Sequence, residues 1–79
     1  MKFYLYNWRA EAKVFSKLEK LGYIMDDGIN GHECSIEVEG DIHGTAKEIY
    51  DIGLNVMLYH DEYSDRDILF VDTKRFQAR

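Results

Sequence analysis

The chain has 79 residues, 46% of them hydrophobic and 14% aromatic, and 15 acidic against 10 basic residues give it a formal net charge of −5. This length and composition predict a single globular domain over residues 1–79 and exclude a disordered chain. Affinity for nucleic acid comes largely from Lys and Arg at the phosphates. The negative charge therefore argues against direct nucleic-acid binding.

Cysteine usage and hydropathy predict where the protein resides. The single cysteine, Cys34, excludes an internal disulfide and suits a reducing compartment. The first residues lack the apolar core of a signal peptide, and no run approaches the ~20 apolar residues of a membrane span. We therefore expect a soluble, cytoplasmic protein that does not associate with membranes.

The chain begins with a predicted strand and helix. Residues 2–6, KFYLY, are rich in residues that favour strands. Asn7 is a candidate helix cap, and apolar residues at helical spacing follow it. These signals predict a helix over residues 8–21, with Gly22 in the left-handed position that commonly ends a helix.

A hairpin is predicted next, because Asn30-Gly31 favours the type I′ turn of a two-residue loop. That turn would pair Ile29 with His32, Met25 with Ile36, and Tyr23 with Val38. Side chains alternate along a strand. The expected core side carries Cys34, Ile36 and Val38, and the opposite side carries Ser35, Glu37 and Glu39.

The second half repeats this order. Thr45 and Glu48 match a capping box, which predicts a short helix from Thr45 to Ile52, ended by Gly53. Residues 55–60, NVMLYH, and a segment after residue 66 are predicted strands joined by a polar loop. Both have apolar residues on both faces, which suits interior strands or an oligomer contact.

The two similar halves predict an α+β fold of the ferredoxin-like (split βαβ) type. The expected order is βαββαβ with an extra C-terminal strand after residue 66. Two helices would cover one face of an antiparallel sheet. The uncovered face is expected to carry Tyr4, Tyr6, Glu37 and Glu39.

Residues 36–50 contain Gly-Asp-Ile-His-Gly between a predicted strand and a predicted helix. This segment resembles the opening motif of metal-dependent phosphoesterases, which implies Asp41 and His43 as metal ligands. A two-metal site needs further ligands from other strand ends, and the family's later motifs are absent. We interpret the segment as a strand-to-helix turn, and we expect no catalytic residue, metal or cofactor.

Two further resemblances concern the fold. Residues 3–8, FYLYNW, are similar to the first-strand motif of RNA-recognition domains, in which an aromatic residue at the position of Tyr4 stacks on a base. Glu37 and Glu39 lie where that family has basic and aromatic residues. Residues 41–57 are similar to part of the ACT domains, small-molecule sensors that often bind their ligand at a dimer interface.

The abundance of tyrosine leads to a functional hypothesis. The chain has six tyrosines and one tryptophan, residues that are enriched at interface hot spots. We expect a non-enzymatic module that docks a basic protein as an inhibitor or adaptor, for example as a DNA mimic. The candidate partner-binding residues are Tyr4, Tyr6, Glu37, Glu39, Asp61, Glu62 and Asp65.

Alternatives to this hypothesis remain open at this point. One is a metal-binding, phosphoesterase-like site at Asp41 and His43, completed across a dimer. Another is an ACT-like sensor at the same turn. A third is a structural homodimer formed through strands 55–60 and 67–73.

Overall fold

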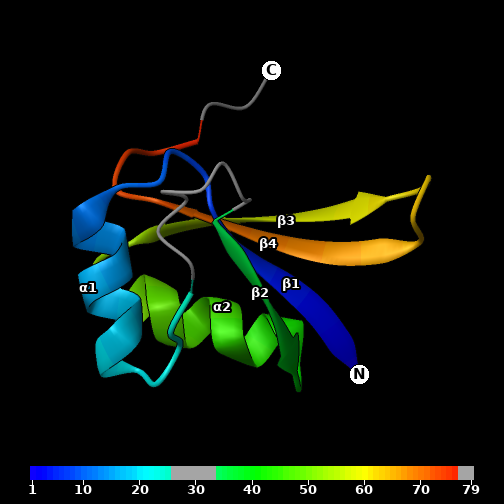
Figure 1. Cartoon of the computed structure of the whole chain (residues 1–79), viewed down its shortest axis with the longest axis horizontal. Helices are drawn as coiled ribbons and strands as arrows, with labels where there is room; N and C mark the ends of the chain where they lie inside the picture. The colour runs from blue at the N-terminus through cyan, green and yellow to red at the C-terminus, as the bar shows by residue number, and fades with distance from the viewer. Residues whose placement is uncertain (26–33, 77–79) are drawn as a thin grey trace.

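The structure is a computed structural model that describes residues 1–25 and 34–76. Its elements, in chain order, are β1 (Lys2–Asn7), α1 (Ala12–Lys20), β2 (Ser35–Glu39), α2 (Ile42–Asp51), β3 (Asn55–Asp61) and β4 (Arg66–Asp72) (Figure 1). The fold is α+β, as predicted. Neither helix in this described part offers the apolar length that a membrane crossing requires.

The strands form one mixed sheet of four strands in the order β2-β1-β4-β3. β1 runs antiparallel to β2 and parallel to β4, while β3 and β4 form an antiparallel hairpin. β4 is central because it is apolar on both faces: Leu69 and Val71 point one way, and Ile68 and Phe70 point the other. A strand with two apolar faces suits an interior position of the sheet, where both of its edges are paired.

Both helices pack on the same face of the sheet (Figure 1), as predicted, because their apolar residues meet one core. The buried core consists of Phe3, Leu5, Val14, Leu18, Ala46, Ile49, Leu54, Leu69 and Val71. Ile36 and Val38 of β2 pack against it, and Cys34 is buried. The alternation predicted for residues 34–39 is therefore confirmed.

The sheet differs from the prediction in two ways. It is mixed instead of antiparallel, because the C-terminal strand lies between β1 and β3 and runs parallel to β1. β1 is the sheet neighbour of β2, and Tyr23 and Met25 lie outside any strand, although both pack on the core. The ferredoxin-like arrangement is not confirmed. The predicted turn at Asn30-Gly31 falls outside the described residues.

Helix α1 begins four residues later than predicted, because Asn7 has a different role. Asn7 is buried, its Nδ2 donates to the Glu11 carbonyl at 3.0 Å, and its Oδ1 accepts from the Glu11 amide at 3.2 Å. These bonds brace a turn in which Ala10 has a φ of 52°. The side chain that we expected to cap a helix thus closes the loop before it.

An ion pair ties this turn to the end of β4. Arg9 donates from Nε to Asp72 Oδ2 at 2.9 Å and from Nη2 to Asp72 Oδ1 at 2.7 Å. The amides of Thr73 and Lys74 also donate to Asp72 Oδ1. Asp72 is buried, and its hydrogen bond from Arg9 holds the pKa of its carboxyl well below the ordinary value. The pair joins segments 63 residues apart in sequence.

We expect Asp72→Asn to lower the free energy of unfolding at neutral pH by about 1–3 kcal/mol, because it removes a charge-assisted pair. A carboxyl with a depressed folded pKa stabilises the protein above its unfolded pKa of about 3.9 and loses that contribution as the pH falls towards the folded value. Urea unfolding from about pH 5 to about pH 2 should therefore show a steeper loss of stability in the wild type than in the variant.

Asp51→Asn is the matched control, because Asp51 is exposed and lies 3.9 Å from Lys47 in a surface pair. Such pairs contribute little, so its effect should stay within about 0.5 kcal/mol. Equal pH profiles for the wild type and Asp72→Asn would contradict the role assigned to Asp72.

Candidate functional site

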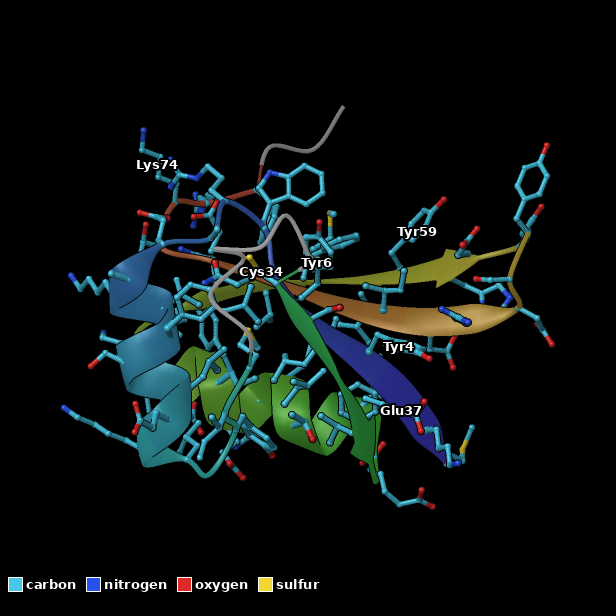
Figure 2. The ribbon with its side chains drawn as sticks, in the orientation of Figure 1. Tyr4, Tyr6, Cys34, Glu37, Tyr59 and Lys74 are labelled. Carbon is cyan, nitrogen blue, oxygen red and sulfur yellow. The ribbon has the colours of Figure 1, made fainter. Side chains whose placement is uncertain are left out.

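The face of the sheet opposite the helices, hereafter the open face, is the most distinctive surface of the described chain. Its residues follow from strand alternation and the register, in which Tyr4 lies beside Glu37 and Ile68, and Tyr6 beside Ser35 and Phe70. The open face comprises Lys2, Tyr4, Tyr6, Ser35, Glu37, Glu39, Met57, Tyr59, Asp61, Arg66, Ile68 and Phe70. Figure 2 shows Tyr4, Tyr6, Glu37 and Tyr59 on the side away from the helices.

Phe70 is the centre of an aromatic cluster on this face. Its ring centroid lies 5.4 Å from that of Tyr6 and 4.9 Å from that of Trp8, both edge to face, and 6.1 Å from that of Tyr59. Trp8 also contacts Phe76 edge to face at 6.3 Å. Each such pair contributes about 0.5–1.5 kcal/mol beyond the area it buries. The rings therefore hold one another in place while Trp8 and Tyr59 stay about half exposed.

Charged groups surround Tyr4 at the neighbouring part of the face. The Tyr4 hydroxyl donates to Glu37 Oε2 at 3.1 Å, and Lys2 Nζ lies 3.5 Å from Glu37 Oε1. The Arg66 guanidinium lies over the Tyr4 ring, 4.7 Å from its centroid. The chain's own Lys2 and Arg66 thus offset part of the negative charge that we predicted for this face.

A depression of about 370 Å³ lies between the aromatic cluster and the β3–β4 turn. Its lining residues are Tyr4, Tyr6, Trp8, Ser35, Asp61, Ser64, Arg66, Ile68 and Phe70. Five of these residues are aromatic or aliphatic, and the other four are polar or charged. A depression of this character can receive an apolar or basic side chain of a partner.

A second depression, of about 400 Å³, lies at the Trp8 end. It is lined by Trp8, Arg9, Met57, Asp72, Lys74, Arg75 and Phe76. Arg9 is paired with Asp72, so Lys74 and Arg75 supply the unpaired positive charge among these residues. The depression at the Trp8 end therefore carries a net positive charge. The carboxylates of the open face lie elsewhere on it, together with Lys2 and Arg66.

The structure brings most of the predicted partner-binding residues onto one surface. Tyr4, Tyr6 and Glu37 are adjacent, and Asp61 lines the same depression. Glu39 lies at the corner of the sheet, 3.9 Å from the terminal amine of Met1. Glu62 and Asp65 belong to the turn at residues 62–65 instead of to the sheet.

Trp8 and Phe70 complete the surface, and sequence reasoning did not place them there. Trp8 continues the alternation of Tyr4 and Tyr6 one step beyond the strand, so this spacing was a signal that could have been extended. Phe70 could not be placed, because its contacts depend on β4 lying next to β1.

The β3–β4 turn is held by its own polar side chains. Asp61 Oδ1 accepts from the Tyr63 amide at 3.2 Å, and Asp61 Oδ2 accepts from Ser64 Oγ at 2.7 Å. The bond from Ser64 is the main cause of the lowered pKa of Asp61. The carboxylate of Asp61 therefore stays ionised and in a fixed position at the edge of the open face.

The Asp41–His43 turn starts helix α2. Asp41 Oδ1 accepts from the His43 amide at 3.2 Å, and Asp41 Oδ2 accepts from the Gly44 amide at 3.1 Å. A Cβ on Gly44 would lie only 3.2 Å from Asp41 Oδ2, so the glycine permits this close cap. The predicted capping box is wrong, because the helix begins at Ile42 and Thr45 is buried within it.

This capping geometry bears on the metal hypothesis. Both carboxylate oxygens of Asp41 accept hydrogen bonds from the helix, and the His43 side chain is exposed. Within residues 1–25 and 34–76, no three His, Cys, Asp or Glu side chains are grouped so that they could hold a metal ion. The described geometry therefore supports a structural role for the Asp41–His43 turn.

Comparison with known proteins gives no relative of this chain. No protein-family model matches it, and searches of the curated proteins and of the solved structures return no significant match.

We expect Asp41→Ala to lower the free energy of unfolding by about 1 kcal/mol, because it removes the acceptor for two helix amides. Glu48→Ala is the matched control. It removes a carboxylate from the same helix, where Glu48 is exposed, and should change stability by less than about 0.5 kcal/mol. Chemical denaturation measures both changes in stability. A larger loss of stability in Glu48→Ala than in Asp41→Ala would mean that Glu48 takes part in a capping box.

We expect His60 to titrate above its ordinary value. Its Nδ1 lies 2.8 Å from Asp67 Oδ1 and its Nε2 lies 3.3 Å from Asp65 Oδ1, and the bond with Asp67 is the main cause of its raised pKa. A raised folded pKa stabilises the protein below the unfolded value of about 6.5, and this contribution is lost as the pH rises through the folded pKa.

An NMR titration of the histidine ring protons tests this expectation. Asp67→Asn should lower the pKa of His60, since it removes the carboxylate that makes the shorter contact. Asp51→Asn, on the exposed surface of α2, should leave it unchanged. An unchanged His60 midpoint in Asp67→Asn would mean that the contact does not persist in solution.

Proposed function

We propose that the protein is a non-enzymatic binding module that docks a basic protein on its open face. The observation that carries this proposal is the aromatic cluster of Tyr6, Trp8, Tyr59 and Phe70 on a sheet face that neither described helix covers. An exposed apolar patch of this kind on a small domain commonly marks an interaction site.

The cluster is suited to binding because its rings are already ordered. Aromatic side chains bring a large contact area with few rotatable bonds, so ordering them on binding costs little conformational entropy. The edge-to-face contacts around Phe70 reduce that cost further. Trp8 is the strongest candidate hot spot, because its indole is 50% exposed and still packed on two rings.

Electrostatics support a partner with a basic surface. The open face and the turn beside it carry two cations, Lys2 and Arg66, against five carboxylates, which are those of Glu37, Glu39, Asp61, Glu62 and Asp65. Carboxylates around an apolar patch raise the rate of encounter with a basic protein. The Arg66 guanidinium lies over the Tyr4 ring. An arginine of a partner would bind an exposed ring of the open face through the same cation–π contact.

The role consistent with this surface is that of an inhibitor or adaptor in the cytoplasm. A basic surface that binds the anionic backbone of nucleic acid would meet carboxylates and aromatic rings on the open face, as in a DNA mimic. The Asp41 carboxylate caps α2, which argues against the metal-dependent alternative at Asp41 and His43. The ACT-like alternative stays a prediction, for which a depression of about 300 Å³ borders the same turn.

Affinity capture from an extract of the source organism, followed by calorimetry with the purified partner, tests the proposal. We expect Trp8→Ala to weaken binding by at least tenfold, as a hot-spot residue does. The matched control is Tyr50→Ala, which removes a ring that is 62% exposed on α2. A partner that binds both variants as it binds the wild type would contradict the use of the open face.

The electrostatic component is tested separately with a charge reversal. Glu37→Lys combined with Glu39→Lys should weaken binding and reduce its dependence on salt, because charged surfaces steer association less at high ionic strength. The control reverses Glu48 and Asp51, which lie on α2. Fluorescence anisotropy with single-stranded oligonucleotides tests whether the open face binds nucleic acid instead. Tight oligonucleotide binding by the wild type that is lost in Trp8→Ala would overturn the proposal.

A further inference from the structure

β3 forms an edge of the sheet, and in the described part of the chain β4 is its only strand neighbour. All seven residues of β3 pair with β4 in an unbroken register, from Asn55 opposite Asp72 to Asp61 opposite Arg66. A strand paired in this regular way, without a bulge, presents a regular row of backbone N–H and C=O groups on its outer side. Such a row is a template for a further strand.

β3 also lacks the devices by which edge strands usually avoid pairing. It contains no Pro, Lys or Arg, and its one carboxylate is the terminal Asp61. The other edge strand, β2, carries Glu37 and Glu39 in the middle and at the end of five residues. Charged residues on an edge oppose pairing, so β3 is the less protected edge.

The outer half of the β3–β4 hairpin is exposed on both sides of the sheet. It extends beyond both helices (Figure 1), and Leu58 and Tyr59, which point to opposite faces, are 42% and 51% exposed. Only the end of the hairpin beyond Tyr59 and Ile68 is two-stranded, because β1 pairs with β4 from Ile68 to Val71. An additional strand along β3 would cover apolar surface on both faces.

We propose that β3 binds β3 of a second copy of this chain, antiparallel, around a two-fold axis at Leu58. A two-fold axis perpendicular to the sheet places residues of the same face opposite each other. Centring it on Leu58 uses the whole strand. The resulting pairs are Leu58 with Leu58, Met57 with Tyr59, Val56 with His60, and Asn55 with Asp61.

This register is self-complementary. Apolar residues meet at its centre, and each Asp61 faces the Asn55 amide of the other copy, so no like charges are opposed. The same operation on β2 would place Glu37 opposite Glu37, which is destabilising. The contact between two copies is therefore assigned to β3 and not to β2.

The dimer would join the two four-stranded sheets into one. Met57 and Tyr59 lie on the open face, so the aromatic clusters of both copies would share one continuous surface. Leu58 lies on the opposite face, where its exposed side chain would contact the same residue of the second copy. The contact between the two copies uses the edge of β3, so it does not depend on which partner binds the open face.

Sedimentation velocity over a wide concentration range tests the dimer. We expect a monomer–dimer equilibrium for the wild type and a monomer for Leu58→Lys, which opposes like charges at the two-fold axis. The matched control is Ile24→Lys, which replaces another exposed apolar residue outside the sheet and should leave dimerisation intact. A wild type that stays monomeric at all concentrations overturns the proposal.

Engineered cysteines test the register in a Cys34→Ala background. Residues directly opposite in an antiparallel pair have Cα atoms about 4.5–5.5 Å apart, which matches disulfide geometry. Leu58→Cys should therefore form a covalent dimer on oxidation, whereas Tyr59→Cys, opposite Met57, should not. Crosslinking of Tyr59→Cys in preference to Leu58→Cys would overturn the register. Adding Trp8→Ala to either cysteine variant should leave its crosslinking unchanged.

Discussion

The parallel pairing of β4 with β1 organises the whole domain, because it brings the most apolar strand into the centre of the sheet. Leu69 and Val71 then complete the core beneath the two helices. Phe70 and Ile68 are placed on the other face by the same strand, where no helix of the described chain covers them. The buried core and the exposed aromatic cluster are thus two consequences of one strand placement.

The one-sided cover follows from the size of the chain. Two short helices of nine and ten residues pack on a four-stranded sheet and cover one of its faces. The other face keeps its large side chains partly in water, and edge-to-face contacts stabilise them. Tyr and Trp tolerate this position because they combine an apolar body with a polar group. The exposed aromatic cluster therefore requires no additional structural element in this fold.

Local patterns in the sequence predicted the elements better than their arrangement. The β-rich run at residues 2–6 and the alternation of residues 34–39 depend on neighbouring residues alone, and both are confirmed. The place of β4 depends on a pairing with β1 that spans more than 60 residues, about which periodicity carries no information. The expectation of an antiparallel sheet was wrong for this reason.

The helix starts and the candidate site also divide into features that neighbouring residues determine and features that depend on the tertiary arrangement. Asp41 and Thr45 are both good caps, and the choice depends on how the chain leaves β2, so the helix began earlier than predicted. Asn7 has a capping side chain, but its burial beside Glu11 gives it a bracing role. Tyr4, Tyr6 and Glu37 were placed correctly by alternation, whereas the contacts of Trp8 with Phe70 could not be predicted before the strand order was known.

The two proposed surfaces meet at Tyr59, which belongs to the aromatic cluster and to the free edge of β3. Pairing through β3 would order the backbone of Tyr59 and place Met57 of the second copy beside it, which enlarges the apolar area offered to a partner. Coupling between two binding events is reciprocal. A partner that contacts both copies would therefore stabilise the dimer by the same free energy with which the dimer strengthens its binding, and two linked sites would raise the effective concentration at the second.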